Sequence, residues 1–167
     1  MVSRSETIID VSWDEVQGLC QSLANKISEE SHRDFDKILA ISRGGLFPAG
    51  LLARALNIRM LDTVCIASYD ENGHHDPVLL KEFHPDFLEG ALIVDDLANT
   101  GATLRLLKSR LLNPHFATLF IKPQSKELVD WYAKETLPHC RVRFPWDDMT
   151  HGTISPKVMY QGIQDTF

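Results

Sequence analysis

The 167-residue sequence has few cysteines, and their arrangement suggests neither a disulfide framework nor a zinc site. Cys20, Cys65 and Cys140 are odd in number, far apart and outside any C-x-x-C pair, as is typical of a reducing compartment. Residues 1–9 lack the apolar stretch of a secretory signal, and no apolar run is long enough to span a bilayer. These absences predict a cytoplasmic protein without a transmembrane segment.

Positive charge is also scarce. Lys and Arg total 17 against 23 Asp and Glu, which gives a net charge of −6, and no basic run is interleaved with aromatic residues. We therefore expect no nucleic-acid partner, and an anionic substrate must be bound by local donors because the overall field opposes it. The composition, 44% hydrophobic and 24% charged, predicts a single domain over residues 1–167 with a substantial core.

Apolar runs and helical spacings alternate along the chain. Apolar runs predict strands over residues 37–42, 60–67, 91–94, 115–121 and 141–144. Helical spacing predicts helices over residues 13–27, with Ser12 as N-cap, 46–56, with Asn57 as the stop, 104–112 and 125–132. This alternation predicts an α/β fold, with a mostly parallel central sheet flanked by helices on both faces. Residues 69–90 lose this periodicity, which predicts a functional loop with a hairpin around residues 78–81.

The most informative segment is residues 91–103, ALIVDDLANTGAT. Asp95 and Asp96 lie where the predicted buried strand should end, at the sheet edge where ligands of α/β proteins bind. In the loop over residues 100–103, free N–H groups at the start of a helix attract anions, and Gly101 allows close backbone approach. Adjacent carboxylates can bind sugar hydroxyls or water on a magnesium ion. Together these features predict a site for a phosphorylated sugar.

A second strand end repeats this pattern. Residues 41–46, ISRGGL, end a predicted strand and open the backbone with Gly44 and Gly45 before a helix that has Pro48 in its first turn. Arg43 adds a fixed charge with several donors, which suits a diphosphate. Two anion sites on one sheet predict a ligand with a phosphate at one end and a diphosphate at the other.

Residues 91–103 resemble the 5-phosphoribosyl-1-pyrophosphate signature of type I phosphoribosyltransferases. Collinear matches over residues 10–150 extend the resemblance to the bacterial xanthine-guanine (6-oxopurine) branch; they include SRGGL at 42–46, SYD at 68–70, KP at 122–123 and PWD at 145–147. The resemblance implies the type I fold and the transfer of ribose 5-phosphate to a nitrogenous base, with release of pyrophosphate, in nucleotide salvage. It also implies Mg²⁺ as cofactor, a flexible hood over residues 69–90, and a homodimer or homotetramer.

The resemblance further implies a role for each matching residue. Pyrophosphate would be bound by Arg43 and Gly44, through a cis peptide, and the 5-phosphate by Thr100, Gly101, Ala102 and Thr103. The ribose hydroxyls and the metal ion would be faced by Asp95 and Asp96, with Asp147 as a further metal ligand. The hood would contribute Ser68, Tyr69 and Lys81, and the base would contact Lys122, Arg141, Val142 and Trp146.

Four positions depart from the 6-oxopurine pattern. Asn99, a third candidate catalytic residue beside the two acids, stands where the family has an acid that takes the purine proton; an amide can hydrogen-bond there but cannot act as a base. Arg141 replaces an aromatic that stacks on the base, which a guanidinium can also do. Arg143 replaces an acid that reads the purine amino group, and Glu82 stands where a basic hood residue is expected. The phosphoribosyl half of the site is intact, and the base half is changed.

Several functions remain open at this point. A 6-oxopurine (xanthine, guanine or hypoxanthine) is the leading acceptor, and a different base is an alternative. A non-catalytic regulator that binds phosphoribosyl pyrophosphate or a nucleotide is a second alternative. An ATPase would need a G-x-x-x-x-G-K-[ST] loop, and a Rossmann-type nucleotide binder would need G-x-G-x-x-G after a strand; the sequence contains neither.

Overall fold

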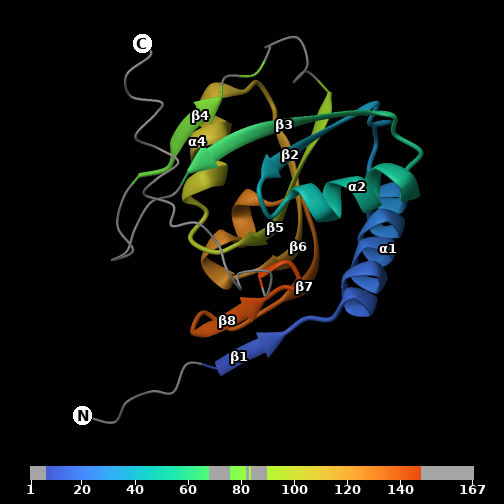
Figure 1. Ribbon diagram of the computed structural model, residues 1–167. Helices are drawn as coiled ribbons and strands as arrows, with labels where there is room; N and C mark the ends of the chain where they lie inside the picture. The colour runs from blue at the N-terminus through green and yellow to red at the C-terminus, as the bar shows by residue number, and fades with distance from the viewer. Residues whose placement is uncertain (1–6, 68–75, 82, 84–89, 148–167) are drawn as a thin grey trace.

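The computed structural model describes residues 7–67, 76–81, 83 and 90–147 (Figure 1). The elements, in chain order, are β1 (Thr7–Asp10), α1 (Trp13–Glu30), β2 (Lys37–Ser42), α2 (Leu46–Ala55), β3 (Met60–Ala67), β4 (Val78–Lys81), β5 (Ala91–Ala98), α4 (Ala102–Arg110), β6 (His115–Ile121), the 3-10 helix η1 (Pro123–Leu128), β7 (Trp131–Glu135) and β8 (Cys140–Arg143). None of the helices in these ranges has the length and hydropathy needed to cross a membrane.

A six-stranded sheet in the order β4-β3-β2-β5-β6-β7 forms the centre of the protein (Figure 1). All its strand pairs are parallel except the one that joins the edge strand β4 to β3. Helices α1 and α2 pack on one face, where Leu23 and Leu52 meet Leu92 of β5, and α4 packs Leu104 on the other. Burial on both faces explains the continuous apolar runs of β2 and β5. The predicted α/β architecture is thereby confirmed.

Several predicted boundaries are also confirmed. Strands β2, β3 and β6 have the predicted limits. Helix α1 begins after Ser12, whose hydroxyl accepts a hydrogen bond from the Glu15 N–H while the Glu15 carboxylate accepts one from the Ser12 N–H, which together form a capping box. Helix α2 ends before Asn57, which has a positive φ of 56°. Strand β4 lies antiparallel to β3, as the predicted hairpin requires.

Strand β5 is longer than predicted. It continues through Asp95 and Asp96 to Ala98, because its pairing with β6 extends as far as Ile121. Its pairing with β2 stops earlier, at Val94. The two acids therefore lie within the strand, at the point where β5 loses one of its two neighbours.

The predicted helix over residues 104–112 is too long. Helix α4 ends at Arg110, and Leu112 is 86% exposed and does not belong to its buried face. The following Asn113 has a positive φ of 50°, a conformation that does not continue a right-handed helix.

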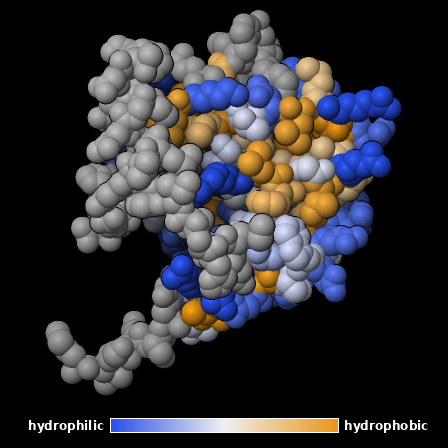
Figure 2. Space-filling model, in the orientation of Figure 1, coloured by the Kyte–Doolittle hydropathy of each residue, from blue (hydrophilic) through white to orange (hydrophobic). Residues whose placement is uncertain are grey.

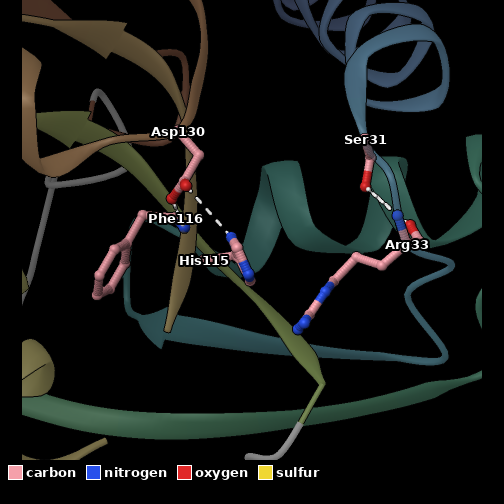
Figure 3. Close-up of polar contacts among 5 residues, drawn as sticks. All are labelled: Ser31, Arg33, His115, Phe116 and Asp130. Carbon is pink, nitrogen blue, oxygen red and sulfur yellow. Dashed lines mark hydrogen bonds and ion pairs between the residues drawn. The ribbon is translucent and has the colours of Figure 1, made fainter. Parts of the chain in front are cut away.

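The predicted helix over residues 125–132 is wrong in type. The chain forms η1 and then β7, because Asp130 already joins β6: its N–H donates to the Phe116 carbonyl at 3.0 Å. Its carboxylate accepts a bond from the Phe116 N–H at 2.8 Å and contacts His115 Nδ1 at 3.2 Å (Figure 3). Trp131 thus lies on a strand, and its ring contacts Phe35. These contacts join residues distant in sequence, which helical spacing cannot detect.

A small second sheet pairs β1 with β8 in parallel. Strand β1 was not predicted, and β8 begins and ends one residue earlier than predicted. The register places Ile8 opposite Arg141 and Asp10 opposite Arg143. The N-terminal strand therefore supports the segment predicted to contact the base.

Candidate functional site

The turn that follows β2 lies against the second half of β5, at the carboxyl edge of the sheet. The two strands pair in parallel as far as Ala40 and Val94, so both chains leave the ladder side by side. A Cβ atom at Gly44 would lie 2.0 Å from Asp96 Oδ2, and one at Gly45 would lie 2.4 Å from the Val94 carbonyl oxygen. Only glycine allows this approach. The segments predicted to bind pyrophosphate and to face the ribose therefore share one site.

The Arg43 turn has a fixed backbone and an exposed charge. The Ser42–Arg43 peptide bond is cis, as the sequence resemblance implies. The Ser42 hydroxyl donates to the Val64 carbonyl at 3.0 Å, and the Gly45 N–H donates to the Ile41 carbonyl at 2.9 Å. The Arg43 side chain is exposed, and no described residue pairs with its guanidinium. The turn thus presents several donors beside Asp96.

The two acids of β5 are partly buried and close together. The Asp96 N–H donates to Asp95 Oδ1 at 2.9 Å. Burial raises the pKa of Asp95 well above its ordinary value, and the adjacent Asp96 charge adds to the rise. Burial also raises the pKa of Asp96, and the Asp147 carboxylate adds to it. Such a concentration of carboxylates favours a bound cation or several hydroxyl donors.

Trp146 holds Asp96 in place. Its Nε1–H donates to Asp96 Oδ2 at 3.3 Å, and its ring stacks on Phe47 at 4.5 Å and on Phe144 at 4.6 Å. The Asp147 carboxylate accepts a bond from the Phe144 N–H at 2.8 Å. The indole predicted to contact the base therefore stacks on two aromatic rings, lies beside a third, that of Trp13, and donates to a carboxylate.

The loop between β5 and α4 places a glycine in the left-handed conformation at the start of a helix. Gly101 has a positive φ of 77° and is the N-cap of α4, which begins at Ala102. A Cβ atom at Gly101 would lie 2.4 Å from Leu128 of η1. The Thr100 hydroxyl accepts a bond from the Ala102 N–H at 3.3 Å, and Thr103 is half-buried in the first turn. The predicted phosphate loop thus opens a helix that points its N-terminus at the sheet edge.

The residues predicted to contact the base differ in their burial and in their partners. Lys122 is only 8% exposed, and its Nζ donates to the Pro138 carbonyl at 2.9 Å, which excludes a plain surface lysine. Its N–H donates to the Ala98 carbonyl, next to Asn99. Val142, predicted to contact substrate, packs its side chain into the core. Two further residues lie exposed on β8: Arg141, and Arg143, which pairs with Asp10.

The hood is described in part. Lys81 lies on β4 opposite Cys65, which in turn lies opposite Ser42, so the lysine is two strands away from the cis peptide at the same edge. Its Nζ lies 3.8 Å from the Asp62 carboxylate. Ser68, Tyr69 and most of the predicted hood lie outside the described residues, as does Glu82.

Three side chains near the site were not predicted from the sequence. Phe47 stacks on Trp146, and its aromatic character in the first turn of α2 was the available signal. Ser125 donates its hydroxyl to the Asn99 carbonyl at 2.7 Å, and Arg105 donates to the Thr100 carbonyl at 2.8 Å. Both side chains donate to backbone carbonyl oxygens, and the spacing of residue types along the sequence does not predict such contacts.

Comparison with known proteins agrees with this geometry. The phosphoribosyl transferase domain family matches residues 12–148. The chain is 41% identical over 146 residues to a protein of Chromohalobacter salexigens named xanthine-guanine phosphoribosyltransferase, a match that covers 87% of this chain and 88% of the relative. A solved purine phosphoribosyltransferase from Pyrococcus horikoshii superposes with a TM-score of 0.70 at 27% identity, and covers 88% of this chain and 97% of its own. A Helicobacter pylori xanthine-guanine-hypoxanthine phosphoribosyltransferase shares the fold, with a TM-score of 0.66, 18% identity, and coverage of 84% and 94%.

Proposed function

Because this chain belongs to the phosphoribosyl transferase domain family, we propose that it transfers ribose 5-phosphate from 5-phosphoribosyl-1-pyrophosphate to a purine base. The acceptor is a 6-oxopurine (xanthine, guanine or hypoxanthine), and pyrophosphate is released. The observation that carries this proposal is the close approach of Gly44 to Asp96, which brings the turn after β2 against the acids of β5, the strand that leads into the loop over residues 100–103. A donor with a diphosphate at one end and a phosphate at the other fits two such turns.

The donor is bound at both ends by backbone and by one arginine. The diphosphate lies at the turn of Arg43 and Gly44, where a guanidinium and free N–H groups neutralise it. The 5-phosphate lies at the loop over residues 100–103, at the start of α4. The ribose lies between them, with its hydroxyls toward Asp95 and Asp96.

The reaction requires little covalent chemistry from the protein. A ring nitrogen of the base attacks the anomeric carbon, and the bond from that carbon to the pyrophosphate oxygen breaks. Positive charge develops on the ribose ring and negative charge on the leaving group. Arg43 neutralises the leaving group, and the fixed turns hold donor and acceptor in line.

Mg²⁺ is the expected cofactor, and the donor set fits it. Asp95, Asp96 and Asp147 would supply the hard oxygen ligands that this ion prefers. Burial raises the pKa of Asp96, and the Asp147 carboxylate adds to the rise, so a bound cation would stabilise the ionised form. Within the described ranges, no three His, Cys, Asp or Glu side chains are grouped so that they could hold a metal ion by themselves. One or two carboxylates would therefore hold the ion together with water and substrate phosphates. When bound, Mg²⁺ neutralises charge on the pyrophosphate.

The residues expected to contact the base suit a purine, but none of Lys122, Arg141 and Asn99 can accept its ring proton. The Lys122 ammonium, now bonded to the Pro138 carbonyl, is the donor for the exocyclic oxygen of the base. Arg141 stacks its guanidinium on the ring. Asn99 cannot accept the ring proton, so the proton passes to solvent.

We also propose that the protein is a homodimer or homotetramer in the cytoplasm. Apolar side chains gather on the face that carries α2 (Figure 2), where Trp13 is 53% exposed and Phe47 and Leu46 are each 40% exposed. A second copy would bury such a surface. The three free cysteines agree with a reducing compartment.

The deciding experiment is a pyrophosphate-release screen across purine and pyrimidine bases with the donor and Mg²⁺. We expect release with at least one 6-oxopurine, loss of release in Arg43→Gln, and retention in the control Arg54→Gln on α2. Release only with another base would replace the acceptor. Calorimetric binding of the donor without release for any base would establish a regulator instead.

A further inference from the structure

Four consecutive backbone carbonyls, from Ala98 at the end of β5 to Gly101 at the start of α4, each accept a hydrogen bond. Two of the donors follow β6, one is an arginine side chain, and one is a backbone N–H of the first turn of α4. The bonds are Lys122 N–H to Ala98 at 3.0 Å, Ser125 Oγ–H to Asn99 at 2.7 Å, Arg105 guanidinium to Thr100 at 2.8 Å, and Arg105 N–H to Gly101 at 2.9 Å.

These bonds determine where the loop N–H groups point. In a trans peptide the carbonyl oxygen of one residue and the N–H of the next lie in the peptide plane and point in opposite directions. Holding the carbonyls of Asn99 and Thr100 therefore turns the N–H groups of Thr100 and Gly101 away from Ser125 and the Arg105 guanidinium. In the described part of the chain these two N–H groups donate no hydrogen bond. They remain available to an anion.

We infer that Ser125 and Arg105 are positioning residues that preorganise the 5-phosphate loop. This inference rests on the proposed function, because the ligand of the loop is the 5-phosphate of the donor. Ser125 is fully buried, and its hydroxyl has this one acceptor. Arg105 also lies against the loop: its guanidinium nitrogen is 3.3 Å from the Cβ position of Gly101.

The hydrogen bonds of Ser125 also connect the phosphate loop to the part of the site expected to contact the base. Ser125 lies in η1, three residues after Lys122, and its N–H donates to the Lys122 carbonyl at 2.9 Å. The serine thus joins the strand end that carries the base-side lysine to the loop that carries the phosphate. Without the hydroxyl, the Asn99 carbonyl has no side-chain donor, and the loop must be ordered when the phosphate binds. That ordering reduces affinity.

The test compares binding of two halves of the donor in separate titrations. In Ser125→Ala we expect the Kd for ribose 5-phosphate to rise about tenfold, the value of one hydrogen bond of about 1.4 kcal/mol. The Kd for pyrophosphate stays within about twofold, because its turn follows β2 and keeps its contacts. The KM for the donor rises in parallel, while kcat changes by less than about threefold. Arg105→Gln gives the same pattern, and Arg105→Lys, which keeps a donor and a charge, restores part of the affinity.

The control is Ser109→Ala, near the far end of α4. The Ser109 hydroxyl also donates to a backbone carbonyl, that of Leu106, at 2.8 Å. This variant leaves both Kd values unchanged. Equal weakening of ribose 5-phosphate and pyrophosphate in Ser125→Ala and Arg105→Gln would indicate general destabilisation and overturn the inference. Unchanged ribose 5-phosphate binding in both variants, with turnover intact, would overturn it and leave the proposed function standing. Absence of ribose 5-phosphate binding and of turnover in the unsubstituted protein would overturn both.

Discussion

Gly44→Ala is the substitution that most sharply separates the chemistry of the site from the stability of the fold. A Cβ atom at this position would lie 2.0 Å from Asp96 Oδ2 and 2.5 Å from its Cγ, whereas Cβ contacts below 3.0 Å are essentially never seen. The carboxylate must therefore retreat by about 1 Å, and a displacement of that size at a reacting site costs about 100-fold in rate. We expect kcat/KM for the donor to fall by about that factor.

Stability should change little, because the obstructing atoms belong to the end of a side chain. The neighbouring Gly45→Ala provides the contrast: its Cβ atom would meet the backbone carbonyls of Val94 at 2.4 Å and Ile41 at 2.6 Å, which cannot rotate away. We expect that variant to lose about 1–3 kcal/mol of unfolding free energy. Gly50→Ala, with nothing within 4 Å of its Cβ atom, is the matched control on α2 and should gain up to about 1 kcal/mol.

Pyrophosphate release at varied donor concentration measures the first effect, and urea unfolding measures the second. Full activity in Gly44→Ala would show that catalysis does not require the close approach of Gly44 to Asp96. The proposal that these two residues act in one site would then be wrong. Equal loss of stability in Gly44→Ala and Gly45→Ala would show that position 44 serves the fold rather than the site.

Further predictions concern Asn99, Trp146 and Cys20. Asn99→Asp supplies a proton acceptor and should increase pyrophosphate release with guanine, hypoxanthine or xanthine; an unchanged rate with all three bases would remove the 6-oxopurines from consideration. Trp146→Phe keeps the ring stack but loses the Nε1–H bond to Asp96, so kcat/KM should fall about three- to tenfold with about 1 kcal/mol lost from stability; wild-type kinetics would show that this bond does not position the acid. Burial raises the pKa of Cys20 to about 12 from an ordinary 9.0, so its thiol should resist alkylation at pH 8 until denaturant is added, as mass spectrometry of the peptide would show. Because the unfolded thiol ionises first, the unfolding free energy should also fall as the pH rises above about 9, and this fall should be smaller in Cys20→Ala.

The parts of the fold that local pattern determines could be predicted from the sequence. Strands β2, β3 and β6 are apolar runs with clear ends, so their limits follow from residue types alone. The helix expected over residues 125–132 failed because Asp130 pairs with Phe116, a contact that spacing within one segment does not record. Strand β1 was missed for the same reason, since its partner β8 lies at the other end of the described chain.

The site shows the same division. Glycines and acids at strand ends have local signatures, and the structure brings the Gly44 turn and Asp96 into contact. The supporting residues have none: Trp146 reaches Asp96 across 50 positions, and Ser125 reaches the Asn99 carbonyl across 26. Their roles depend on tertiary packing, which places a side chain where no sequence interval predicts it.

The most direct measurement is a crystal structure of the protein with 5-phosphoribosyl-1-pyrophosphate and Mg²⁺. The proposed function predicts one donor molecule that spans both turns, with its pyrophosphate at Arg43 and Gly44 and its 5-phosphate at Thr100 and Gly101. A donor that contacts one turn and leaves the other without ligand, or that binds away from Asp96, would contradict it.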